Sequence, residues 1–125
     1  MNQAVPKQAD PLLTLAEKTA AYLLLEMSNE VNLTQVVSKM ATNRNKLSLA
    51  FKTHYGATPL NWLKQQRMEK ASQLLIHTQQ SIADITFAVG YKDSNHFSTA
   101  FKQHHGVSPK QYREQYATSK AKNKR

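Results

Sequence analysis

The sequence repeats itself at a spacing of 50 residues, and this repeat limits what the chain can fold into. Asn45, Ser48, Ala50, Phe51, Lys52, His54, Gly56 and Pro59 recur as Asn95, Ser98, Ala100, Phe101, Lys102, His104, Gly106 and Pro109. The apolar residues before them correspond at a shift of 49, as in Val36 and Ile85. Two copies are too few for a solenoid, so we expect two similar units mounted in one body.

Each copy has the pattern of two short helices joined by a tight turn. In the second copy, Ser81 is a suitable N-cap for a helix with apolar residues on one face, and Gly90 can end that helix. Asp93 then opens a second helix, which Gly106 ends. This arrangement is the helix-turn-helix unit, whose second helix enters the major groove of DNA.

Scarce glycine and proline, and no run of alternating β-branched residues, predict an all-α fold of about seven helices. We expect residues 1–10 to be a disordered lead or linker, 11–57 a first helix-turn-helix lobe and 58–78 a linker helix. Residues 79–116 would form the second lobe and 117–125 a basic tail. The linker helix would be about 28 Å long at 1.5 Å per residue. Such a rod could hold two recognition helices near the ~34 Å recurrence of the major groove on one face of B-DNA.

Apolar spacing predicts which side of each helix is buried. The expected stripe of the first helix is Leu13, Ala16, Ala20, Leu23, Leu24 and Met27. The expected stripe of the linker helix is Leu60, Leu63, Arg67, Ala71, Leu74 and Leu75. Trp62 is expected to pack back on the preceding helix.

Positive charge is concentrated in the repeated region. The net charge is +9, and residues 33–125 hold 15 of the 17 basic side chains but four of the eight acidic ones. This imbalance favours a polyanionic partner, with nucleic acid first, although it also fits a merely solubilising surface. The chain has no cysteine, which excludes disulfides and thiolate zinc sites. No segment is long and apolar enough for a membrane span, so we expect a cytoplasmic protein.

The outward face of each recognition helix holds the candidate DNA-reading residues. The base-contacting candidates are Arg44, Asn45, Ser48 and Leu49 in the first copy and Ser94, Asn95, Ser98 and Thr99 in the second. Arginine can pair with guanine, asparagine with adenine, and serine or threonine with either. The phosphate-contacting candidates are Lys46, Lys52 and Lys102.

Two features of these faces bear on how the bases are read. Leu49 is either a reader of the thymine methyl group or plain surface. The second face carries no arginine, so we hypothesise that the first recognition helix supplies most of the specificity.

Other kinds of site are not expected. Asp93, Ser94 and His96 are explained by a helix cap and two outward residues, so no nucleophile, base and orienting group can be assembled and we expect no enzyme. His54 and His104 hold equivalent repeat positions, which suggests a structural role at a helix end. Adjacent side chains diverge on a helix, so His104 and His105 predict no metal site, and no cofactor is expected.

The sequence from Ile82 to Arg113, IADITFAVGYKDSNHFSTAFKQHHGVSPKQYR, closely resembles the signature of the AraC/XylS family of bacterial transcription regulators. Residues 47–59 match the weaker half of that pattern, and the resemblance covers about residues 11–116. It implies two helix-turn-helix lobes joined by a long helix, with their recognition helices in adjacent major grooves. By position, the family's base readers fall on Asn45, Ser48 and Leu49 and on Asn95, Ser98 and Thr99.

The resemblance also implies promoter binding, most often with activation through RNA polymerase. Most members of the family carry an additional effector-sensing or dimerising domain. This chain holds no such domain, and the linker-like residues 1–10 favour a fragment of a longer protein. Two alternatives on the same scaffold are a protein-interaction module and a nonspecific nucleic-acid binder.

Overall fold

The computed structural model describes residues 10–123, with side chains described as far as residue 117. This part of the chain contains seven helices and no strand, which confirms the all-α class. The helices are α2 (Pro11–Leu25), α3 (Leu33–Lys39), α4 (Arg44–Tyr55), α5 (Pro59–His77), α6 (Ile82–Ala88), α7 (Ser94–His105) and α8 (Pro109–Asn123). The backbone of α8 therefore continues into the expected basic tail, whereas residues 1–9 of the expected lead lie outside the described part.

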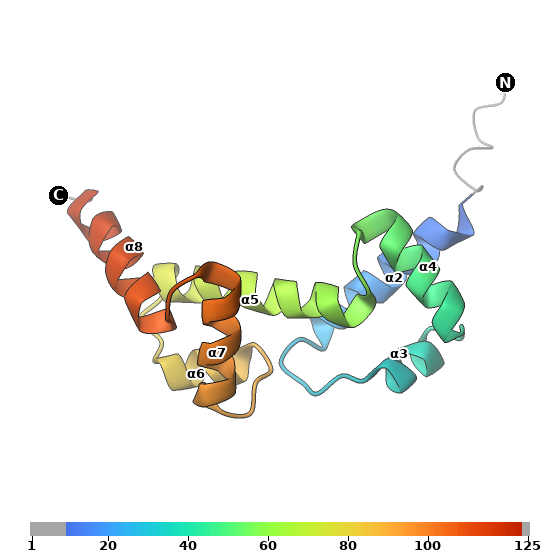
Figure 1. Ribbon diagram of the computed structural model, residues 1–125, viewed down its shortest axis with the longest axis horizontal. Helices are drawn as coiled ribbons and strands as arrows, with labels where there is room; N and C mark the ends of the chain where they lie inside the picture. Colours follow the sequence, from blue (N-terminus) through green and yellow to red (C-terminus); the bar gives the residue numbers. More distant parts are fainter. Residues whose placement is uncertain (1–9, 124–125) are drawn as a thin grey trace, which may run out of the picture. The chain divides into compact units, whose positions relative to one another are not determined.

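The chain divides into two compact units. The first unit comprises the chain up to Glu26 together with Val31–Leu63, and the second comprises Met27–Glu30 and the chain from Lys64 onward. In the first unit, α4 packs mainly on α2 and also touches α3 (Figure 1). Its core consists of Ala16, Ala20, Leu23, Val36, Leu47, Ala50, Phe51 and Leu63.

In the second unit, α7 packs on α6 and α8 (Figure 1). The core of this unit consists of Met68, Ala71, Leu75, Ile85, Val89, Phe97, Ala100 and Phe101. Helix α5 is continuous over 19 residues and contributes Leu63 to the first core and Met68, Ala71 and Leu75 to the second. Among the helices of residues 10–123, none combines the length and apolarity needed to cross a membrane.

The sequence repeat reappears in the packing of α4 and α7. Phe51 and Phe101 are completely buried, and each is capped by an aromatic ring from the next helix. The Phe51 and Trp62 ring centroids lie 5.6 Å apart, and those of Phe101 and Tyr112 lie 5.2 Å apart, both edge to face. The expectation that Trp62 packs back on the preceding helix is therefore confirmed.

All seven helices of residues 10–123 begin after a side chain that accepts a hydrogen bond from the backbone N–H three residues on, as N-caps do. These residues are Asp10, Asn32, Asn43, Thr58, Ser81, Asp93 and Ser108, with donor–acceptor distances of 2.8–3.3 Å. For α4 the cap is Asn43, whose side chain accepts from Lys46 N.

The predicted stripe of α2 is partly wrong. Leu13 and Leu24 are exposed, and the helix ends at Leu25. The buried residues are Ala16, Thr19, Ala20 and Leu23, which form one narrow face. Thr19 can lie in this face because its hydroxyl donates to the Leu15 carbonyl at 2.8 Å, leaving no polar group unpaired. In α5, Leu60 is likewise exposed, while Met68 and Ser72 are buried.

Two arginines bind carbonyls at helix C-termini, where backbone acceptors lack helical partners. Arg67 Nε donates to Met27 O at 3.1 Å and its Nη2 donates to Asn29 O at 2.8 Å, just beyond α2. Arg113 donates in the same way to Leu75 O and Thr78 O at the end of α5, at 3.0 and 3.1 Å. Burial lowers the pKa of Arg67, and the nearby Tyr91 partly opposes that shift.

Gly90 occupies the turn between α6 and α7 at φ +90°, where it lies against this Arg67 contact. A Cβ at this position would collide with Met27 O and would lie 2.8 Å from Arg67 Nε. At Gly106, with φ +87°, a Cβ would meet nothing within 4 Å. The two glycines therefore differ in steric surroundings, although they share a left-handed backbone.

We expect Gly90→Ala to destabilise the protein more than Gly106→Ala. The Gly106 variant should lose about 1–2 kcal/mol of unfolding free energy, the cost of a side chain in the left-handed region. The Gly90 variant should lose clearly more, because the collision with Met27 and Arg67 is added to that strain. Urea unfolding followed by circular dichroism measures both losses, and equal losses would contradict the predicted collision.

Candidate nucleic-acid interface

Helix α4 presents a polar, partly basic face opposite its buried face. Leu47, Ala50 and Phe51 point into the core of the first unit. The predicted readers lie on the other side: Arg44, Asn45, Leu49 and Lys52 are exposed and Ser48 is half-buried. The structure thus brings these five residues onto one accessible surface. Leu49 is 56% exposed, so no part of this unit covers most of its side chain.

Arg44 is held by a contact that the sequence did not indicate. Its Nη2 donates to the hydroxyl oxygen of Thr34 on α3 at 2.9 Å. Because α3 and α4 are the two helices of the motif, this bond ties the arginine to the motif's first helix. The repeat gave no signal for it, since Ala83 and Ser94 stand at the corresponding positions of the second copy. Thr34 is therefore a residue of this candidate site that the sequence did not indicate.

Lys46 lies apart from the other candidates on α4. It is exposed, but it lines a hollow beside α2 together with Lys18 and Met40. The structure thus places Lys46 on the flank of the reading face rather than in its middle.

Helix α7 repeats this arrangement in the second unit. Phe97, Ala100 and Phe101 are buried. The predicted readers Ser94, Asn95 and Thr99 are exposed, as is Lys102, and Ser98 is half-buried. The face is polar, and its only cation among the predicted readers and phosphate contacts is Lys102.

The first turn of α7 is organised by Asp93. One carboxylate oxygen accepts the backbone N–H of His96 at 2.8 Å, and the other lies 2.8 Å from Nδ1 of the same residue. The backbone hydrogen bond, followed by the imidazole contact, lowers the pKa of Asp93. Asp93 is therefore the cap that the sequence predicts for this helix.

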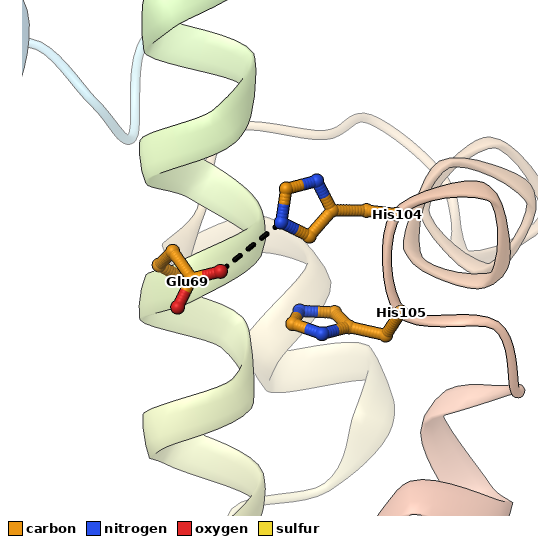
Figure 2. Close-up of side chains that lie close together, drawn as sticks. All are labelled: Glu69, His104 and His105. Carbon is orange, nitrogen blue, oxygen red and sulfur yellow. Dashed lines mark hydrogen bonds and ion pairs between the residues drawn. The ribbon is translucent and has the colours of Figure 1, made fainter.

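The repeated histidines both contact an acidic residue from another helix segment of their own unit. His54 Nε2 lies 3.4 Å from Asp10 Oδ2, and His104 Nε2 lies 3.0 Å from Glu69 Oε2 (Figure 2). Both contacts fit the expected structural role at a helix end. The expected divergence of His104 and His105 is wrong, because their ring centroids are only 4.6 Å apart and both rings face α5 (Figure 2).

The sequence of this chain matches a known family of protein domains. The family described as helix-turn-helix domain matches residues 36–115. The transcriptional activator RhaS of Enterobacter sp. strain 638 is 36% identical over 77 residues, which are 62% of this chain and 28% of that relative. The matched residues thus span little more than a quarter of that relative's length.

Solved structures share the fold. The C-terminal domain of AraT, a response regulator from Geobacillus stearothermophilus, superposes with a TM-score of 0.77 at 34% identity, covering 85% of this chain and 86% of that domain. The DNA-binding domain of the global transcriptional factor AdpA, solved with a target DNA, superposes with a TM-score of 0.78. Its identity is 23%, and the match covers 89% of this chain and 96% of that one. At this identity the second likeness concerns the fold alone.

We expect Asp93 to make stability depend on pH in the acidic range. Its pKa is lowered in the folded state, so its stabilising effect is complete above the unfolded pKa of about 3.9. The effect is lost as the pH falls through the lower folded value. Asparagine also caps helices but does not titrate. Between pH 7 and pH 3, the melting temperature of Asp93→Asn should therefore fall by less than that of the native protein.

Thermal unfolding by circular dichroism measures this difference, and Asp93→Ala serves as the control that lacks the cap at every pH. Parallel losses of melting temperature in the native protein and Asp93→Asn would contradict the role given to this carboxylate.

Proposed function

This chain belongs to the AraC-type helix-turn-helix domain family, and we propose that it binds double-stranded DNA sequence-specifically and thereby regulates transcription. The observation that carries the proposal is the matched construction of α4 and α7. Each helix buries one apolar face in its own unit and leaves a polar face with a terminal lysine exposed. A recognition helix needs this division, because one side must be anchored while the other reads base edges.

We assign base reading to the exposed faces by their hydrogen-bonding groups. Arg44 suits guanine, and Asn45 and Asn95 suit adenine. Ser48, Ser94, Ser98 and Thr99 can contact several bases, and the exposed Leu49 suits a thymine methyl group. Lys52 and Lys102 would contact phosphate, and Lys46 would do so at the flank.

Among the proposed base-reading residues, Arg44 has a side chain that is preorganised by a hydrogen bond within the protein. Its hydrogen bond to Thr34 restricts a long side chain before DNA arrives, so less conformational entropy is lost on binding. The second unit has no such arginine. This difference supports the hypothesis that α4 supplies most of the specificity.

We propose that both recognition helices bind one duplex, in adjacent major grooves. The support is the length of α5, which runs unbroken over 19 residues. At 1.5 Å per residue it spans about 28 Å, comparable with the ~34 Å between major grooves on one face of B-DNA. Where the match is imperfect, bending of the DNA would make up the difference.

We further propose action at promoters in the cytoplasm, with activation through RNA polymerase. The support is the resemblance to transcription regulators and the description of the relative RhaS as a transcriptional activator. We assign no catalytic role to these residues.

We expect selection from a random duplex pool to yield two short motifs about one helical turn apart. With the selected duplex, fluorescence anisotropy should show an affinity that falls steeply with salt, because bound lysines and arginines release counterions. A random duplex of the same length is the control. Equal binding of both duplexes would indicate a nonspecific binder, and no binding of either would favour a protein-interaction module.

We expect Arg44→Ala and Lys52→Ala to fail in different ways on the selected duplex. Arg44→Ala should cost about 1–3 kcal/mol and relax specificity at one base pair, whereas Lys52→Ala should weaken all sequences alike and reduce the salt slope by about one. Asn95→Ala should relax specificity less than Arg44→Ala. Gln73→Ala, at an exposed position of α5, is the control.

Anisotropy titrations against single-base variants of the selected duplex measure these effects. Greater loss of discrimination in Asn95→Ala than in Arg44→Ala would show that α7, not α4, is the main reader.

A further inference from the structure

Three potential metal ligands converge in the second unit, away from the predicted reading residues. Glu69 comes from α5, and His104 and His105 come from the last turn of α7. One ligand atom from each residue lies within 4.8 Å of the other two, and Figure 2 shows both imidazole rings turned toward the carboxylate. Glu69 and His104 are exposed and His105 is half-buried, so solvent ions can reach the group.

We propose that this group binds a Zn²⁺ ion and thereby ties the end of α7 to α5. Two imidazole nitrogens and one carboxylate oxygen are ligands that zinc accepts, with bond lengths of about 2.0–2.2 Å. The ligand atoms would have to move closer together by a small amount to reach those distances. Three protein ligands leave a fourth tetrahedral position for water.

The hydrogen bonds that His104 and His105 make in the structure are compatible with zinc binding. His104 Nε2 already lies 3.0 Å from Glu69 Oε2, so the ion would replace one polar contact between the same two atoms. His105 Nε2 lies 3.1 Å from Met68 O. If this nitrogen binds the ion, its proton resides on Nδ1. The Met68 carbonyl, inside α5, keeps the helical hydrogen bond from the residue four positions on.

The first unit provides an internal comparison. At the repeat positions of His104 and His105 it has His54 and Tyr55. His54 contacts Asp10, which makes a pair and not a group of three. Among the described residues, the second unit therefore has a group of three possible metal ligands, whereas the equivalent positions of the first unit do not form one.

The experiment uses the full chain without a polyhistidine tag, freed of metal with a chelator and then titrated with ZnCl₂ by calorimetry. We expect one zinc ion per chain and a zinc-dependent rise in melting temperature. Glu69→Gln and His104→Gln should each weaken zinc binding at least about tenfold. His54→Gln, at the equivalent repeat position, should leave the affinity within about twofold, since it is outside the group.

Glu69 and His104 carry the test because both are exposed, whereas His105 stacks on Phe101 and Tyr112 and its replacement also disturbs the core. Circular dichroism without zinc establishes that each variant folds. Absorption of the Co²⁺-substituted protein gives a second readout, because tetrahedral cobalt has visible bands that the two variants should lose. The absence of saturable binding, or equal weakening by His54→Gln, would overturn the proposal.

Discussion

The burial of the phenylalanine that α4 and α7 share through the repeat is the contact on which the rest of each unit depends. Phe51 and Phe101 are fully covered, and each meets an aromatic ring from the following helix. Burying a side chain of this size contributes about 1.5–3 kcal/mol. It also fixes the rotation of the helix about its own axis. Once the phenylalanine and the neighbouring alanine point inward, the residues on the opposite side must face solvent, where a ligand can reach them.

Local signals in the sequence were sufficient for much of this architecture. The capping residues Ser81 and Asp93 follow directly from the sequence, because a cap is determined by a side chain and the three residues after it. The 50-residue repeat predicted the shared burial of α4 and α7 without any knowledge of their surroundings. The outward faces followed from that burial, and the structure exposes most of the residues assigned to them.

The remaining features depend on neighbours that lie far away in the sequence. The periodicity of α2 indicates which side is apolar, but it does not indicate how much of that side the other helices cover. The prediction that Leu13 and Leu24 are buried is therefore wrong. The bond from Arg44 to Thr34 crosses the turn of the motif and has no counterpart in the repeat. The proximity of His104 and His105 arises because both rings reach toward α5, which simple helical geometry does not reveal.

The hydrogen bonds of Arg67 determine which residues must be kept together if the second unit is transferred to another protein. Met27–Glu30 follow α2 in the chain, yet they belong to the compact unit that contains α6 and α7. Arg67 is bonded to the carbonyls of Met27 and Asn29. A transplant of the second lobe that started at α5 would leave this half-buried guanidinium without its acceptors. The exchangeable module is therefore discontinuous, and a chimera would have to bring this four-residue loop with it.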